Sequence, residues 1–520
     1  MSTIQIILLS LFISFMAVET YWWGGTIYIA RPVFAGPLIG LIMGDFRTGL
    51  VCGGMIEMVF LGGLSMGAYS PPNAYIGGMV GTALAIMAGG NIELGVTLAY
   101  PIGLLVQALN YIVTNINIVW VERAENAARA GKTREIGIYH HMSILTIMIV
   151  RFFLPTVAAL LLGSEYIQAF YDSMPPIITA GLSVAAGILP AIGMASILQT
   201  LGIKKGWPYF LIGFIMSVYL NMPIMSIALA GVALAAVIYQ CSGQKVSVKD
   251  FKIGEKSERK NSLTNKEFRS MFFRSFSSMG SFNYKSYNAI GYLYSIIPGL
   301  KKIYKDDPEG LKESLTRIMG VSLAMEEEKA SDPNFDTKMI SSTKAALMGP
   351  LAGIGDSVFQ GIFRVMFSAI GASLAIQGNP VGPWVYLVPN VLLAWGTRWG
   401  FLKGGYQYGM KLVKKLRESN LFETFVSLAT IVGMMVIATM TASFVNLTFK
   451  PEWTYVAATA DAAAKTISLQ GVFDAIMPRF LPLLLVLIMY KVIKNVKGGI
   501  YWCLIGTFVI AFVGVAIGLL

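Results

Sequence analysis

Four carboxylate side chains interrupt or border the long apolar stretches of this sequence: Glu19, Glu57, Glu93 and Asp356. An ionisable group inside an apolar segment is costly to bury, so such groups usually mark a substrate or ion pathway. Glu19 and Glu93 stand near the ends of their stretches, where a carboxylate can lie at a membrane interface. Glu57 and Asp356 are therefore the stronger candidates for chemistry.

Glu57 follows a pair of glycines by one helical turn, in the segment 53–58. Glycines allow another backbone to come close, and a carboxylate can accept two hydrogen bonds at once. A polyol such as a sugar needs an acceptor of this kind. We therefore expect Glu57 to bind substrate, and the alternative is a structural contact between helices.

Asp356 and Ser357 follow the segment 349–355, which contains three glycines and one proline. This pattern predicts a broken helix that lines a cavity, because irregular backbone at membrane depth needs protein or water as a partner. A tight structural turn is the alternative. The segment 36–45 has a faintly similar pattern, which makes an inverted repeat a hypothesis.

Asn73 comes directly after two prolines and could offer its amide to a sugar hydroxyl. Turn formation is the alternative, because Pro-Pro-Asn is also typical of loops. The neighbouring His140 and His141 cannot share a helix face, so we expect no metal site. The sequence contains no phosphate-binding loop or serine-nucleophile motif, so we expect no cofactor and no phosphoryl-accepting residue in this chain. Whether the chain counts as an enzyme stays open.

The composition indicates a membrane protein. The chain has 520 residues, of which 55% are hydrophobic and 13% charged. Soluble domains carry about 25% charged residues. The apolar residues occur in long runs, as in transmembrane helices. The net charge of +12 fits basic cytoplasmic loops better than nucleic-acid binding.

Charge divides the chain into two membrane halves joined by a polar segment. Residues 245–344 hold 18 of the 40 Lys and Arg residues and 13 of the 28 Asp and Glu residues. We predict an all-α, polytopic membrane protein with broken or re-entrant helices and a polar, cytoplasmic helical segment in the middle. The predicted parts are a membrane domain (1–240), a linker (241–262), interfacial amphipathic helices (263–344) and a second membrane domain (345–520).

Basic loops predict the orientation, because Lys and Arg stay on the cytoplasmic side. Such loops lie near residues 123–134, 204–205, 403–417 and 491–497. The run 207–240 must then consist of two short passes hinged near residues 221–223, since the chain has to return to the cytoplasm. The same argument places 450–477 and the C-terminus outside.

Two sets of motifs resemble the membrane subunits of the mannose-family phosphotransferase system. Residues 1 to about 240 are similar to enzyme IIC, through the segments 30–45 and 53–67. Residues 263–520 are similar to enzyme IID, through the segments 263–266, 274–276, 281–284, 347–357 and 398–409. These subunits are usually separate chains, so this sequence resembles a fusion of the two, natural or engineered.

The resemblance implies a multi-pass protein of the bacterial inner membrane, among its lipids, which binds a hexose or amino sugar and carries it inward by an elevator-like movement. A separate IIB would phosphorylate the sugar, supplied by IIA, HPr and enzyme I. Homotrimers are expected. The residues that the resemblance assigns to the sugar, with Gln360 added one turn beyond the motif, are Tyr28, Glu57, Asn73, Asn283, Asp356, Ser357 and Gln360.

Two departures from the family pattern affect these expectations. A Phe-Asn-Thr-His-Pro-like segment of many relatives is replaced here by residues 311–318, so docking through that segment is in doubt. Asn73 stands where mannose-type members often have Asp. Because polar mismatches discriminate strongly between substrates, an amino sugar, an N-acetylated sugar or a related hexose is expected rather than mannose.

Two other functions remain open from the residues. A secondary transporter could use Glu57 and Asp356 to couple sugar uptake to protons or sodium. A membrane receptor or scaffold is the third interpretation, because the resembling family also serves as a docking site for some bacteriocins.

Overall fold

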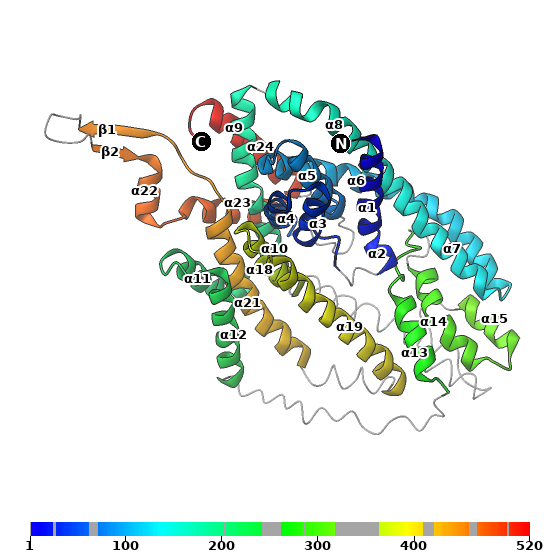
Figure 1. Ribbon diagram of the computed structural model, residues 1–520. Helices are drawn as coiled ribbons and strands as arrows, with labels where there is room; N and C mark the ends of the chain where they lie inside the picture. The colour runs from blue at the N-terminus through cyan, green and yellow to red at the C-terminus, as the bar shows by residue number, and fades with distance from the viewer. Residues whose placement is uncertain are drawn as a thin grey trace.

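The computed structural model describes residues 2–23, 28–61, 71–173, 175–201, 203–241, 262–283, 288–317, 363–408, 421–456, 465–496 and 499–520. Almost all of these segments are helical (Figure 1). The predicted helical membrane fold is confirmed, with one addition, an antiparallel pair of strands, β1 (Glu452–Val456) and β2 (Lys465–Ser468). The predicted site residues Asp356, Ser357 and Gln360 lie outside the described residues, as does 242–261 of the predicted linker.

The first half begins at the N-terminus and ends at Cys241. Its elements are α1 (Thr3–Ala17), α2 (Glu19–Trp22), α3 (Pro32–Met43), α4 (Phe46–Phe60), α5 (Ala74–Met87), α6 (Ile92–Arg129), α7 (Thr133–Thr146), the π-helix η1 (Ile147–Phe153), α8 (Leu154–Ser173), α9 (Pro176–Ile188), α10 (Pro190–Leu201), α11 (Ile203–Val218) and α12 (Ile224–Cys241).

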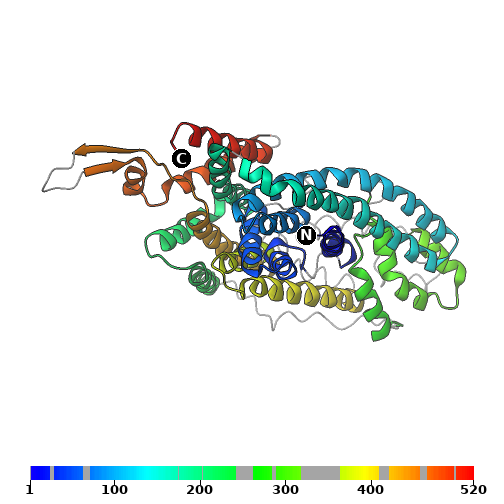
Figure 2. The ribbon, with the colours of Figure 1, turned by 45° about the horizontal axis from the view of Figure 1, so that its top comes forward.

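The second half follows from Ser262 onward. Before the strands its helices are α13 (Asn265–Ser275), α14 (Ala289–Ile303), α15 (Pro308–Arg317), α18 (Arg364–Ile376), α19 (Gly382–Tyr408) and α21 (Leu421–Phe444). After the strands come α22 (Leu469–Ile476), α23 (Phe480–Asn495) and α24 (Gly499–Ala516). The strand pair projects away from the helices (Figure 2).

Six helical segments of the described chain are long and apolar enough to cross a membrane, or seven if α22 and α23, bent by 78°, form one span. Several shorter apolar helices lie among them, including α3, α5 and α18. The predicted break in the run 207–240 is confirmed, because helix α11 ends at Val218 and α12 begins at Ile224. Asn221 in this break has a φ of +48°, which a continuous helix does not allow.

Helix α6 is long enough to leave the membrane. Its 38 residues extend about 57 Å at 1.5 Å per residue, whereas about 20 residues span a bilayer. Its last turns pack with α7 against α13–α15 of the second half (Figure 1). The core of this contact includes Val121, Ala124, Ile136, Phe268, Met271, Leu293 and Leu300.

Helices α3 and α4 form a hairpin in which two backbones touch. A Cβ atom at Gly36 would lie 2.6 Å from the carbonyl oxygen of Gly49, and a Cβ atom at Gly49 would lie 2.6 Å from that of Gly36. The chain reverses at Gly44, whose φ of +86° suits glycine. Since small residues allow such close approach, this hairpin depends on glycine at the contact.

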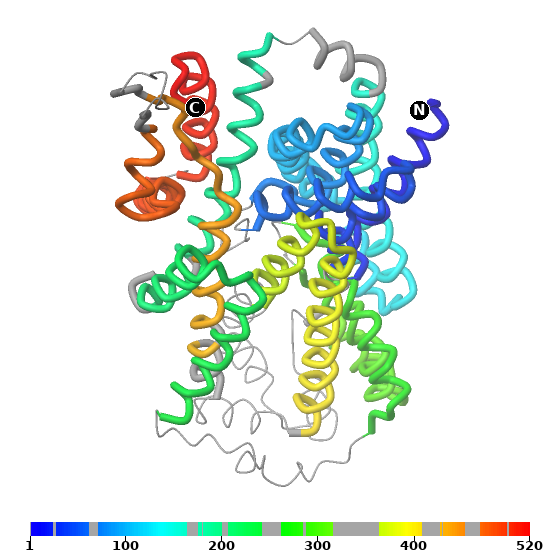
Figure 3. Tube along the Cα trace, turned by 60° about the vertical axis from the view of Figure 1, so that its left-hand side comes forward, coloured from blue at the N-terminus to red at the C-terminus, as the bar shows by residue number. Residues whose placement is uncertain are grey.

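The two halves interlock along several helix pairs. Helix α18 packs on α4, α19 on α3, and α21 on α10, α11 and α12. A Cβ atom at Gly54 of α4 would lie 3.0 Å from the Ala372 carbonyl oxygen of α18, so glycine again permits the contact. Figure 3 shows α18 and α19, in yellow, extending from the centre of the first half.

We predict that Gly36→Ala destabilises the protein by about 1–3 kcal/mol, because the new methyl group meets backbone atoms that cannot rotate away. Thermal unfolding in detergent should show a lower Tm. Gly506→Ala is the matched control, because this helical glycine of α24 has no atom within 4 Å of the added carbon. Equal Tm values for the two variants would contradict the role of the glycine contact.

We also predict that residues 1–241 and 262–520, produced together as separate chains, assemble and co-purify. The reason is that several helix pairs make contacts between the two halves. The measurement is affinity capture of one tagged part followed by detection of the other, with an unrelated tagged membrane protein as the control. Recovery of the tagged part alone would show that the covalent connection is needed.

Candidate functional site

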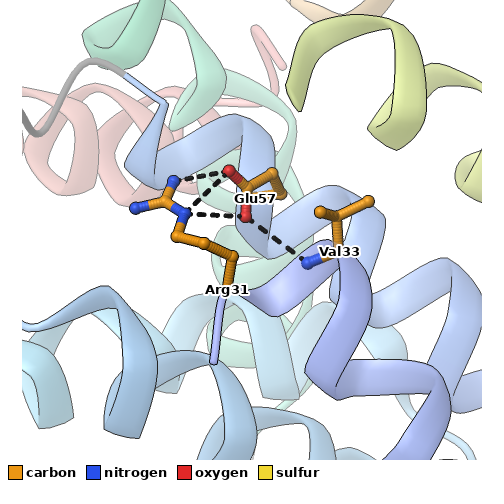
Figure 4. A network of polar contacts seen from close by, with 3 residues as sticks. All are labelled: Arg31, Val33 and Glu57. Carbon is orange, nitrogen blue, oxygen red and sulfur yellow. Dashed lines mark hydrogen bonds and ion pairs between the residues drawn. The ribbon is translucent and has the colours of Figure 1, made fainter. Parts of the chain in front are cut away.

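A buried ion pair joins the start of α3 to the end of α4. The Nε atom of Arg31 donates to both Glu57 carboxylate oxygens, at 3.0 and 3.2 Å, and Nη2 donates to Oε1 (Figure 4). The backbone N–H of Val33 donates to Oε2 at 3.4 Å. Arg31 is 3% exposed and Glu57 0% exposed. Both charges therefore lie in the protein interior and neutralise each other.

The local sequence explains this geometry. The antiparallel α3–α4 hairpin brings the last turn of α4 beside the first turn of α3. A helix N-terminus attracts a carboxylate through its unpaired N–H groups and its dipole. Pro32 occupies the first helical position and has no N–H, so Val33 carries the first donor. The Glu57 carboxylate thus accepts hydrogen bonds both from the Arg31 guanidinium and from the N-terminus of α3.

The carboxylate of Glu57 is already engaged in this arrangement. A carboxylate offers about four acceptor positions, and Arg31 and Val33 make four contacts to it. The geometry supports a role for Glu57 in holding the Arg31 guanidinium. A direct contact between Glu57 and a sugar stays a prediction.

Tyr28 lies beside this ion pair with a strained backbone. Its φ is +59°, a conformation that costs a non-glycine residue about 1–3 kcal/mol and often occurs at functional sites. The Tyr28 N–H donates to Oε1 of Glu19 at 2.9 Å. Glu19 is 1% exposed and accepts this bond in the protein interior. Glu93 is exposed. Their place at a membrane interface stays a prediction.

The second half completes this region with Arg364 and Tyr386. The Tyr386 ring of α19 meets the Tyr28 ring edge to face, with centroids 6.3 Å apart. Arg364, the first residue of α18, interacts electrostatically with Arg31 and the tyrosines. We call the set the central polar cluster; its members are Glu19, Tyr28, Arg31, Glu57, Tyr75, Arg364 and Tyr386.

Asn73 caps a helix in the structure. Its Oδ1 accepts from the Ile76 N–H at 2.9 Å at the start of α5, and its own N–H donates to the Gly103 carbonyl at 2.9 Å. The turn alternative is therefore realised by the amide oxygen. A sugar contact of Asn73 stays a prediction that concerns its amide nitrogen.

Asn283 lies at a second contact between the halves. Its Nδ2 donates to the Ser281 carbonyl at 2.9 Å, and the Ser281 hydroxyl lies 2.5 Å from Nδ1 of His140. The His140 ring stacks on Tyr294 at 4.9 Å. The hydroxyl of Ser143 donates to the Gly280 carbonyl at 2.9 Å. His140 therefore joins α7 to the second half, and the described residues hold no group of three or more potential metal ligands.

Two residues selected from the sequence, Tyr28 and Glu57, lie in the central polar cluster, and their binding of sugar stays a prediction; the sequence reasoning missed the basic members and Tyr386. Arg31 and Arg364 were detectable, because a cation in an apolar run is as conspicuous as a carboxylate. Tyr386 carried no such signal, since an isolated tyrosine in an apolar run is typical of a membrane helix. Asp356, Ser357 and Gln360 precede Arg364 closely in the chain but lie outside the described residues.

Two family models match the chain, one after the other. The model described as "PTS system sorbose-specific iic component" matches residues 3–237. The model described as "PTS system mannose/fructose/sorbose family IID component" matches residues 262–520. The two matches leave residues 238–261 between them.

Individual relatives agree with this division. The fructose permease IID component of Bacillus subtilis is 35% identical over 51% of this chain and 99% of the relative. The fructose permease IIC component of the same organism is 31% identical over 48% of this chain and 90% of the relative. A solved structure of the mannose transporter ManYZ with microcin E492 is 28% identical over 51% of this chain and 99% of that chain, with a TM-score of 0.28.

Helical spans, interlocked halves and a buried polar cluster define a membrane permease component. The chain belongs to the mannose/fructose/sorbose family of the phosphotransferase system, with IIC and IID joined in one polypeptide. It is a multi-pass inner-membrane protein and a sugar-translocating component of such a system, so it works with a sugar substrate and a IIB partner. These matches do not favour the ion-coupled transporter or the receptor.

We predict that Glu57→Leu and Arg31→Met each destabilise the protein by about 3–5 kcal/mol, because each leaves one buried charged group without its partner. The double variant Arg31→Met/Glu57→Leu should regain part of the lost Tm, since two apolar side chains of similar volume can replace a buried pair. The measurement is thermal unfolding of all four proteins in detergent. Additive losses in the double variant would contradict direct coupling of the two residues.

Proposed function

We propose that the protein binds a hexose or amino sugar at the central polar cluster and presents it on the cytoplasmic side to a separate IIB for phosphorylation. The observation that carries this proposal is the buried Arg31–Glu57 pair beside Tyr28 and Tyr386, which come from different halves. A site of this kind offers hydrogen bonds together with apolar ring faces, the combination that small-molecule sites use.

The charge balance supports a neutral substrate. Arg31 and Glu57 neutralise each other. A neutralised ion pair does not need a counter-ion from its ligand. A sugar supplies hydroxyl groups that both donate and accept hydrogen bonds.

The segment before α18 supports Asp356, Ser357 and Gln360 as additional sugar-binding residues. Gln360 precedes Arg364 by four residues, so their Cα atoms are at most about 14 Å apart. Arg364 belongs to the central polar cluster and α18 packs on α4. The short stretch of chain between these residues and Arg364 supports including them in the proposed site. Asn73 and Asn283 complete the proposed set.

Phosphorylation in this proposal is the task of other proteins. The phosphoryl group passes from enzyme I through HPr and IIA to a histidine of IIB, and from there to the sugar. The membrane component binds, carries and presents the sugar, as a homotrimer that moves in an elevator-like way. The relatives are named for fructose, mannose and sorbose, which supports a hexose-type substrate.

We expect sugar phosphate to appear inside vesicles only when the purified protein, IIB, IIA, HPr, enzyme I and phosphoenolpyruvate are all present. A panel of labelled hexoses and amino sugars, separated as free and phosphorylated forms, provides the measurement. Vesicles without IIB are the control. Accumulation of free sugar without the soluble proteins, abolished by an uncoupler, would contradict the proposal.

Asp356→Asn should weaken sugar binding about tenfold or more, because an amide replaces a charged acceptor among the proposed ligands. Glu93→Gln is the matched control, because Glu93 is an exposed carboxylate that does not belong to the proposed site. Binding of labelled sugar to the two purified variants decides the point. Equal affinities would remove Asp356 from the proposed site.

A further inference from the structure

The hydroxyl of Tyr386 is a buried polar group without a partner among the described residues. The residue is 0% exposed, and its hydroxyl oxygen makes no hydrogen bond with the part of the chain that the structure describes. Buried tyrosine hydroxyls usually find a partner, because a buried polar group without one destabilises the fold. The vacant hydrogen-bonding capacity of Tyr386 therefore calls for a functional explanation.

Packing holds Tyr386 at its position. A Cβ atom at Gly371 of α18 would lie 2.8 Å from the Tyr386 Cβ atom and 2.7 Å from the Gly382 carbonyl oxygen. Helices α18 and α19 are therefore in backbone contact at this level. On the other side the Tyr386 ring meets Tyr28 edge to face. The side chain is thus fixed between the two halves.

Charged side chains act on the hydroxyl of Tyr386. It interacts electrostatically with Glu57, Arg31 and Arg364, but it forms no hydrogen bond with these residues. Binding a polar ligand is the benefit that a hydroxyl offers there.

A second donor in the same cluster has capacity left. Arg31 uses Nε and Nη2 on Glu57, and its third guanidinium nitrogen, Nη1, points away from the carboxylate (Figure 4). Nη1 makes no hydrogen bond to any residue within the described ranges. The first half thus contributes a fixed N–H donor, and the second half a fixed hydroxyl.

We propose that Tyr386 is a sugar-binding and specificity-determining residue, whose hydroxyl exchanges a hydrogen bond with one sugar hydroxyl beside Nη1 of Arg31. This inference rests on the proposed function. It assigns a sugar contact to a described residue of the second half. A site built to bond a particular hydroxyl rejects the analogue that lacks it, because the protein group is then left unpaired. Tyr386 consequently selects for one position of the sugar ring.

The test measures binding of labelled sugar to the full-length protein in lipid nanodiscs, for the wild type and for Tyr386→Phe. The probes are the best-bound hexose or amino sugar and its monodeoxy analogues. Tyr304→Phe is the control, because Tyr304 is also a buried tyrosine of the second half but lies in the contact of α13–α15 with α6.

We expect Tyr386→Phe to bind the parent sugar about tenfold more weakly, with an unchanged or higher Tm. One deoxy analogue should bind the wild type about tenfold more weakly than the parent sugar does, yet bind the variant as well as the parent does. Tyr304→Phe should retain the wild-type affinity and the wild-type preference among the analogues.

Wild-type affinity of Tyr386→Phe would overturn the inference, and so would weaker binding with the same relative preference for every analogue, because the hydroxyl would then act only on the fold. A wild-type protein that binds no hexose or amino sugar would overturn the proposed function as well. The two failures are therefore distinguishable.

Discussion

The Arg31–Glu57 ion pair is the constraint on which the centre of this protein depends. Neither charge could remain in a membrane interior without the other, and the pair forms only when the end of α4 lies against the start of α3. Contact between the backbones of the two helices makes this possible, because glycines remove the side chains that would separate them. The ion pair can therefore form only if the hairpin packs with its two backbones in contact.

The second half is arranged around the same hairpin. Helix α18 packs on α4 and α19 on α3, so the chain that follows the linker brings Arg364 and Tyr386 to a cluster begun by the first half. A further contact, between His140 of α7 and Ser281 after α13, also joins the halves. The polar groups of both halves therefore meet only in the complete fold.

Sequence reasoning identified part of this cluster because a charged residue within an apolar run can be recognised from the sequence alone. Glu57 was conspicuous as a carboxylate in an apolar run, and Arg31 and Arg364 were equally visible by the same rule. The burial of Glu19 by protein could not be foreseen, since position along a run does not show what the short helix α2 packs against. Asn73 had two roles open to it, and the structure realises the capping role through its amide oxygen.

By itself the sequence determined the class of protein, the division into two membrane halves and the family, because apolar runs, charge density and motifs are properties of consecutive residues. Only the tertiary structure decided which carboxylate pairs with which cation, how the acceptors of Glu57 are used and that Tyr386 meets Tyr28. The first two outcomes depend on the packing of the α3–α4 hairpin, and the third depends on contact between segments more than 300 residues apart, such as α3 and α19. Spacing along the chain contains no information about that distance in space.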